Sequence, residues 1–140
     1  MTNNNPTTLQ PLFLELAPAS DSVTVVTQAA ESYFEEAGLP MRVSMKLLIA
    51  IDEIVTNIYS YSGASMFSVE IECPDNSVKM SFRDNGTPFD PSGQKSADIT
   101  LSAEERQIGG LGILMVKKTM DSFEYCYEDK QNVLTVSKKF

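Results

Sequence analysis

The sequence contains no histidine, and this absence excludes several common kinds of active site. Without histidine the chain cannot build a Ser-His-Asp or Cys-His catalytic group. It also lacks the commonest metal ligand and has no histidine to accept a phosphoryl group. Any general base must therefore be a carboxylate, a lysine or a tyrosine.

Cysteine is also scarce, because Cys73 and Cys126 are the only two in the chain. They are too few and too far apart for a zinc site. Each lies in a segment whose polar and apolar residues alternate as they do in a strand. We therefore expect two free, half-buried thiols without a catalytic role.

Basic residues are outnumbered, with 11 Lys and Arg against 19 Asp and Glu, which gives a formal net charge of -8. Residues 1–41 contain no basic residue at all. The averaged field of such a chain repels phosphate backbones and anionic lipid surfaces. Neither a nucleic acid nor a membrane is an expected partner.

Long hydrophobic runs are missing as well. The longest purely apolar run covers residues 47–51, and residues 1–10 are polar, without the charged region or the apolar stretch that is typical of a signal peptide. A chain of 140 residues with 42% hydrophobic composition can still bury one apolar core. We expect a single domain over residues 1–140, located in the cytoplasm.

Periodicity and turn residues predict the order strand, helix, helix, hairpin, loop, helix, hairpin. The expected elements are a strand at 12–16, helices at about 21–37 and 42–61, a hairpin at 67–73 and 78–83, a helix at about 110–120, and a hairpin at 123–127 and 134–136 with its turn at 128–132. Gly38 and Gly63 can end the first two helices. Because most strands are amphipathic, the fold class is α+β, a two-layer sandwich with helices on one face of a mixed, mostly antiparallel sheet.

The second expected helix carries an acid and an amide one helical turn apart, at Glu53 and Asn57. On a helical wheel at about 100° per residue, four candidate core residues lie on one side of the helix and a second group lies on the opposite side. The core candidates are Leu47, Ile51, Ile54 and Ile58, and the second group is Lys46, Ala50, Glu53 and Asn57. The pair could serve a proton and a metal ion, and the alternative is a solvated polar face.

The segment Asp84-Asn85-Gly86 directly follows an expected strand. Pro88 and Pro91 cannot donate to a strand ladder, so we expect the turn to open into a loop. An aspartate at a strand end can accept a hydrogen bond from a ligand amine, and the glycine lets the backbone come close. A structural turn aspartate is the alternative.

The segment Gly109-Gly110-Leu111-Gly112 immediately precedes an apolar helical stretch. Unpaired amides at a helix start favour phosphate oxygens, and missing side chains let those oxygens approach. The alternative is a hinge for the preceding loop at 85–108, which is long for a connection inside a compact domain.

In this order, Glu-x-x-x-Asn, DNGTPFD and GGLGI resemble the motifs of the GHKL or Bergerat-fold ATPase superfamily. The chain looks closest to the small anti-sigma factor serine-protein kinases of bacterial partner-switching systems. The resemblance covers nearly the whole chain. It implies the Bergerat ATP-binding fold, ATP and Mg²⁺ as cofactors, and an ATP lid at about 87–108.

The resemblance also implies roles for individual residues. Glu53 would be the catalytic base, and Asn57 would hold a Mg²⁺ that bridges the ATP phosphates. Asp84 would bind the adenine amino group, and Gly86 would let the base approach. The remaining implied nucleotide contacts are Gly109, Gly110, Leu111 and Gly112 at the phosphates, Arg106 or Lys95 at the terminal phosphate, and Thr135 near adenine.

These features make an ATP-dependent serine/threonine protein kinase the leading hypothesis. Its substrate would be a small antagonist protein of the anti-anti-sigma type, and it could also sequester a sigma factor and form a homodimer. Relatives that hold a sigma factor use a basic residue on the first helix, which residues 1–41 lack. The alternatives are a non-catalytic, nucleotide-dependent switch module that binds a protein, and a detached ATP-binding half of a two-component kinase.

Overall fold

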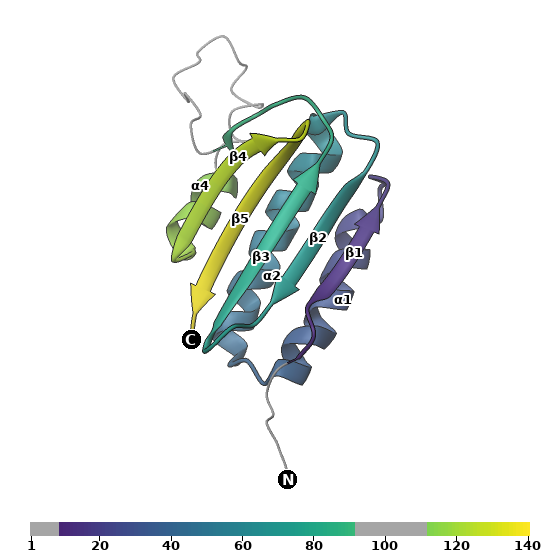
Figure 1. Ribbon diagram of the computed structural model, residues 1–140. Helices are drawn as coiled ribbons and strands as arrows, with labels where there is room; N and C mark the ends of the chain where they lie inside the picture. Colours follow the sequence, from purple (N-terminus) through teal and green to yellow (C-terminus); the bar gives the residue numbers. More distant parts are fainter. Residues whose placement is uncertain (1–8, 92–111) are drawn as a thin grey trace.

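The computed structural model describes residues 9–91 and 112–140 (Figure 1). Their elements are β1 (Leu12–Leu16), α1 (Ser22–Ala37), α2 (Met41–Asn57), the π-helical turn η1 (Ile58–Ser62), β2 (Phe67–Glu72), β3 (Ser77–Asp84), α4 (Gly112–Thr119), β4 (Ser122–Glu128) and β5 (Gln131–Lys139). This order of strands and helices is the one predicted from periodicity.

The five described strands form one sheet in the order β1-β2-β3-β5-β4. Each neighbouring pair among them is antiparallel. Figure 1 shows the helices on one face of this sheet, with α2 behind its centre and α1 and α4 to either side. The predicted α+β architecture of two layers is confirmed.

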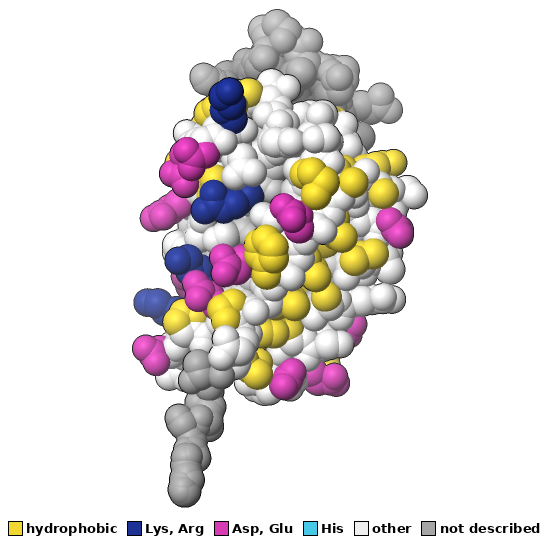
Figure 2. All heavy atoms as spheres, turned by 45° about the vertical axis from the view of Figure 1, so that its right-hand side comes forward, with side chains coloured by type: hydrophobic (Ala, Val, Ile, Leu, Met, Phe, Trp, Pro, Cys, Tyr) yellow, Lys and Arg dark blue, Asp and Glu magenta, His cyan; other side chains and the backbone are white. Residues whose placement is uncertain are grey.

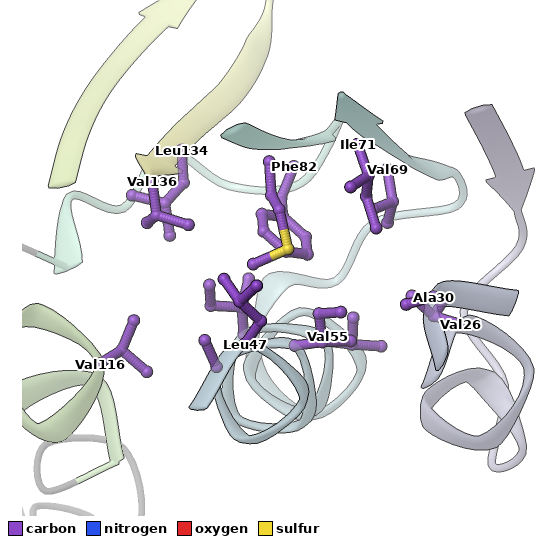
Figure 3. Packing of buried hydrophobic residues seen from close by; sticks show 14 of the residues in the cluster. Val26, Ala30, Leu47, Val55, Val69, Ile71, Phe82, Val116, Leu134 and Val136 are labelled. Carbon is purple, nitrogen blue, oxygen red and sulfur yellow. The ribbon is translucent and has the colours of Figure 1, made fainter. Parts of the chain in front are cut away.

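The core lies between the sheet and the helices. Phe82 of β3, Leu47 of α2 and Val26 of α1 are each at most 1% exposed. Figure 3 shows Phe82 pointing from the sheet toward α2, with Val116 of α4 on one side. Burying each large apolar side chain contributes roughly 1.5–3 kcal/mol, so this layer fixes α2 against the middle of the sheet.

Glycines end the first two helical segments as predicted. Gly38 follows α1 with φ 73°, and Gly63 follows η1 with φ 69°. Both angles lie in the left-handed region, which residues with a Cβ rarely adopt. None of the helices in residues 9–91 and 112–140 is long and apolar enough to cross a membrane.

The last hairpin is tighter than predicted. Its turn consists of Asp129 and Lys130, with φ of 52° and 62°, as in the two-residue turn that matches the twist of a hairpin. The predicted turn at 128–132 was therefore too long. Asn132 lies within β5, and its side chain is on the buried face with Leu134.

The two cysteines are free, as predicted, but they differ in exposure. Cys73 is half-buried, whereas Cys126 is exposed because it lies on the outer face of the edge strand β4. The expectation of two half-buried thiols was wrong for Cys126.

The opposite edge of the sheet is partly apolar. Within the described residues β1 pairs only with β2, and Phe13 on this edge strand is 58% exposed. Figure 2 brings this side of the molecule forward and shows hydrophobic side chains across the middle and right, with Lys and Arg on the left. The strand is short and lies between Pro11 and Pro18, which limits its pairing with another chain.

Candidate active site

Two of the three sequence motifs meet at Glu53 and Gly112. Gly112 is the first residue of α4, and a Cβ added to it would overlap Oε1 of Glu53. Asn57 lies one turn beyond Glu53 at the end of α2, and both side chains are half-buried. Neither side chain makes a hydrogen bond within the part of the chain that the structure describes. The acid and the amide are thus free to meet a ligand beside the start of α4.

The environment of Glu53 favours a proton acceptor. Burial raises the pKa of the Glu53 carboxyl above its ordinary value of 4.5, and the negative charge of Asp52 raises it further. Asp52 is exposed, and its carboxylate accepts a hydrogen bond from the Thr56 hydroxyl at 3.2 Å. A carboxylate with a raised pKa takes up a proton more readily than an ordinary one.

The predicted grouping of α2 residues was wrong for Ala50. Its side chain is 1% exposed and belongs to the core, whereas Lys46 is exposed and Glu53 and Asn57 are half-buried. The reason is that α4 packs beside α2 and widens its buried face. Glu53 and Asn57 therefore lie on the flank of α2, beside the core.

Each residue of Asp84-Asn85-Gly86 has a different neighbour. The Asn85 side chain accepts hydrogen bonds from the backbone of Ser65 and Met66, at 2.9 and 3.2 Å. A Cβ at Gly86 would overlap the carbonyl oxygen of Ser62, at the end of η1. The motif is thus packed directly against the end of η1, which continues from α2, the helix that carries Glu53.

Asp84 is a buried carboxylate with one occupied oxygen. It is 7% exposed, and its Oδ1 accepts hydrogen bonds from the Gly86 N–H at 2.9 Å and from Asn132 Nδ2 at 3.0 Å. No hydrogen bond reaches Oδ2 from residues 9–91 and 112–140. Since burying an unpaired acceptor is costly, Oδ2 is suited to a donor such as an exocyclic amine.

Asn132 is the site residue that sequence reasoning missed. It is 6% exposed and pairs with Asp84 across β3 and β5. The signal was present in the sequence, because residues 132, 134 and 136 alternate with outward-facing neighbours. Placing Asn132 in a turn concealed this alternation.

Thr135 was assigned wrongly to the adenine site. It pairs with Ser81, and its hydroxyl lies 3.4 Å from the Ser81 hydroxyl. Asp84 and Asn132 alternate with this pair along their strands, so Thr135 lies on the opposite face of the sheet. The polar side chain that β5 presents next to Asp84 is Asn132.

The remaining predicted contacts lie outside the described residues. These are Lys95, Arg106, Gly109, Gly110 and Leu111, together with most of the predicted lid at 87–108. The described start of that segment has no strand after Asp84, in agreement with the prediction from Pro88 and Pro91.

The oxygen donors at this site suit a magnesium ion that takes most of its ligands from phosphate and water. In residues 9–91 and 112–140, no group of three or more His, Cys, Asp and Glu side chains could hold a metal. Mg²⁺ prefers oxygen ligands and commonly takes one or two from protein, with the rest from phosphate and water. The side-chain oxygen of Asn57 fits that pattern.

Residues 16–138 match the family described as "Histidine kinase-like ATPase domain". The chain belongs to this family, which confirms the resemblance inferred from the three motifs. It is 25% identical over 129 residues to serine-protein kinase RsbW of Listeria monocytogenes serovar 1/2a, an alignment that covers 86% of this chain and 82% of the relative. It is also 25% identical over 100 residues to serine/threonine-protein kinase BtrW of Bordetella bronchiseptica, covering 69% and 70%.

Solved structures share the fold. A crystal structure of the RsbU and RsbW domains of Rv1364c from Mycobacterium tuberculosis aligns with a TM-score of 0.68 and 15% identity, covering 94% of this chain and 32% of that longer one. The SiaB-SiaC complex from Pseudomonas aeruginosa aligns with a TM-score of 0.63 and 15% identity, covering 95% and 89%. At these identities the likeness establishes the fold.

Proposed function

We propose that the protein is an ATP-dependent serine/threonine protein kinase that phosphorylates a small antagonist protein in a bacterial partner-switching system. The contact between Glu53 and Gly112 is the observation that carries this proposal. It joins a candidate base to the helix start where phosphate groups are expected. The similarity to two proteins named as serine or serine/threonine kinases supports the same activity.

The residues have distinct tasks in this proposal. Bound ATP with Mg²⁺ supplies the phosphoryl group and neutralises part of its negative charge. Glu53 accepts the proton of the attacking hydroxyl, and the side-chain oxygen of Asn57 holds Mg²⁺. Oδ2 of Asp84 accepts a hydrogen bond from the adenine amino group. Gly112 leaves room for the Glu53 carboxylate at the start of α4.

Several parts of the proposal concern residues outside the described part of the chain. Gly109, Gly110 and Leu111 would line the phosphates, and Arg106 or Lys95 would neutralise the terminal phosphate. Arg106 and Lys95 would belong to a lid at about 87–108. Their roles rest on the motif resemblance alone.

The proposed protein partner is an antagonist of the anti-anti-sigma type. The structural likeness to SiaB in its complex with SiaC supports a protein-binding role. Binding of a sigma factor, a homodimer and a cytoplasmic location are further parts of the proposal. The lack of any basic residue in residues 1–41 favours a second candidate, a switch module that binds nucleotide and protein without phosphotransfer.

Single-turnover phosphotransfer separates the two candidates. The protein is mixed with [γ-³²P]ATP, Mg²⁺ and its cognate small antagonist protein, and label on the antagonist is followed with time. A kinase transfers the label to serine or threonine, whereas a pure binding module leaves the γ-phosphate on the nucleotide. Glu53→Ala should bind ATP without transfer, while Glu31→Ala, on the exposed side of α1, should match the wild type.

A further inference from the structure

We infer that Asn132 is a positioning residue that supports the base selectivity of the site by holding the Asp84 carboxylate in one orientation, with Oδ2 turned to the ligand. The inference rests on the proposed function, because it takes Asp84 as the group that reads the base. It assigns the site a purine with an exocyclic amine at position 6 and a discrimination against 6-oxopurines.

The amide of Asn132 is held in one orientation. Its Oδ1 accepts hydrogen bonds from the Phe89 N–H at 3.0 Å and from the Tyr125 hydroxyl. Its Nδ2 donates to the Thr87 carbonyl at 2.9 Å and to Asp84 Oδ1 at 3.0 Å. All four hydrogen-bonding positions of the amide are therefore occupied. If the amide were flipped, Nδ2 would face the Phe89 N–H, donor against donor, and Oδ1 would face the Thr87 carbonyl, acceptor against acceptor. The orientation is therefore unique.

This fixed donor holds Asp84 in one orientation. Oδ1 of Asp84 receives two donors, Asn132 Nδ2 and the Gly86 N–H, and a backbone N–H cannot act as an acceptor. The atom at that position must therefore be an acceptor. The other oxygen, Oδ2, is left to meet the ligand, and a carboxylate oxygen there attracts an amine and repels a carbonyl oxygen.

Asn132 also connects Asp84 to the backbone that follows it. The carbonyl of Thr87 and the N–H of Phe89 both bond to Asn132, and the Thr87 N–H donates to the Ser62 carbonyl at 3.0 Å. One side chain of β5 thus sets both the carboxylate and residues 87–89. Asp84 and Asn132 are buried, whereas Thr87 and Phe89 are exposed, so removing Asn132 leaves a buried acceptor of Asp84 with one donor fewer.

Asn132→Asp tests the donor with almost no change in shape. The new carboxylate can still accept from Phe89 and Tyr125, but it presents an acceptor to Asp84 where Nδ2 donated. Two adjacent carboxyl groups share a proton more readily as the pH falls, so the effect should shrink toward acid. Asn76→Asp, in the exposed turn before β3, makes the same chemical change away from the site and serves as control.

Calorimetric titrations with Mg²⁺ and either ATP or ITP, which carries a 6-oxo group, measure selectivity directly. At pH 8, Asn132→Asp should weaken ATP binding by at least about tenfold and reduce the ATP-over-ITP preference, with partial recovery at pH 5.5. Asn76→Asp should match the wild type. A folded Asn132→Asp protein that keeps wild-type affinities at both pH values, or loses ATP and ITP by the same factor, would overturn the inference.

Asp84→Asn gives a second, independent test if Asn132→Asp does not fold. With Asn132 and the Gly86 N–H both donating, an amide at position 84 must turn its oxygen toward them and its NH₂ toward the ligand. The preference should therefore invert, with ITP bound more tightly than ATP. Equal affinity for the two, or a retained ATP preference, contradicts the inference. If the wild type binds neither nucleotide, the proposed function fails as well.

Discussion

The carboxylate of Glu53 lies so close to Gly112 that a Cβ on that glycine would overlap Oε1. One residue comes from the flank of α2 and the other from the start of α4. The contact places a group that can accept a proton beside backbone amides that can meet phosphate. A side chain at position 112 would therefore have to displace the Glu53 carboxylate.

Gly112→Ala should lower the rate of phosphotransfer, because the added methyl group pushes the Glu53 carboxylate aside. The fold should lose little stability, since that carboxylate is the end of a flexible, half-buried side chain and alanine is a better helix former than glycine. Single-turnover transfer measures the first effect, and urea unfolding followed by circular dichroism measures the second.

The double variant Gly112→Ala, Glu53→Asp is the matched control for stability. The shorter aspartate withdraws from the new methyl group, so any stability that Gly112→Ala loses should return. If Gly112→Ala transfers phosphate at the wild-type rate, the close contact does not position Glu53 in solution.

The rate of phosphotransfer should fall on acidification with a midpoint above pH 4.5. Glu53 must be ionised to accept a proton, and burial followed by the charge of Asp52 raises the pKa of its carboxyl above the ordinary value of 4.5. Single-turnover transfer measured between pH 4.5 and 8 locates the midpoint. Asp52→Asn removes one of the two causes and should move the midpoint to lower pH. If the midpoint does not move in Asp52→Asn, the fall in rate at acid pH is not caused by protonation of Glu53.

The same pKa shift predicts a stability effect. The folded state holds a proton on Glu53 at pH values where the unfolded chain has lost it, so this group lowers stability as the pH rises through that window. Glu53→Gln cannot ionise and should lose less stability than the wild type between pH 4.5 and 7. Thermal melting at several pH values tests this, and parallel curves for the two proteins would contradict it.

Asp84→Ala should weaken adenine nucleotides far more than it weakens the fold. A hydrogen bond to a charged group contributes roughly 1.5–3 kcal/mol, which corresponds to about a 10- to 100-fold loss of affinity. Asn132 Nδ2 and the Gly86 N–H each lose an acceptor, and this cost is partly offset because the desolvation cost of a buried charge is removed. Calorimetry and thermal melting give the two quantities. Equal ATP affinity for Asp84→Ala and the wild type would remove Asp84 from the adenine site.

Tyr33→Phe should stabilise the protein at alkaline pH. The Tyr33 hydroxyl is buried beside Cys73, and burial, followed by the charges of Cys73 and Glu72, raises its pKa to about 12. The unfolded chain loses this proton near pH 10, so stability contributed by the neutral hydroxyl is lost between about pH 10 and 12. Phenylalanine has no such proton, and urea unfolding at pH 8 and 11 should show a smaller decrease. An identical decrease would contradict the prediction.

Local patterns predicted most of the fold. Alternation located all five strands, and Gly38 and Gly63 ended the helices because their left-handed φ is available to glycine. The turn at Asp129 and Lys130 was misjudged, and this one error concealed Asn132. Strand parity decides which face of the sheet a residue occupies, and Thr135 lies on the opposite face from Asp84 and Asn132.

The assembly of the site could not be predicted from spacing alone. Glu53 and Gly112 are far apart in the sequence, and only packing of α4 beside α2 brings them together. The same packing buries Ala50, which a wheel drawn for a single helix assigns to the polar side. Family resemblance supplied the grouping of the motifs, and the side-chain network around Asp84 required the structure.

A crystal structure with Mg²⁺ and a non-hydrolysable ATP analogue tests the central claim most directly. We expect Mg²⁺ on the side-chain oxygen of Asn57, the terminal phosphate between Glu53 and the start of α4, and the adenine amino group on Oδ2 of Asp84. A nucleotide bound elsewhere, or Glu53 and Asn57 turned away from its phosphates, would contradict the account.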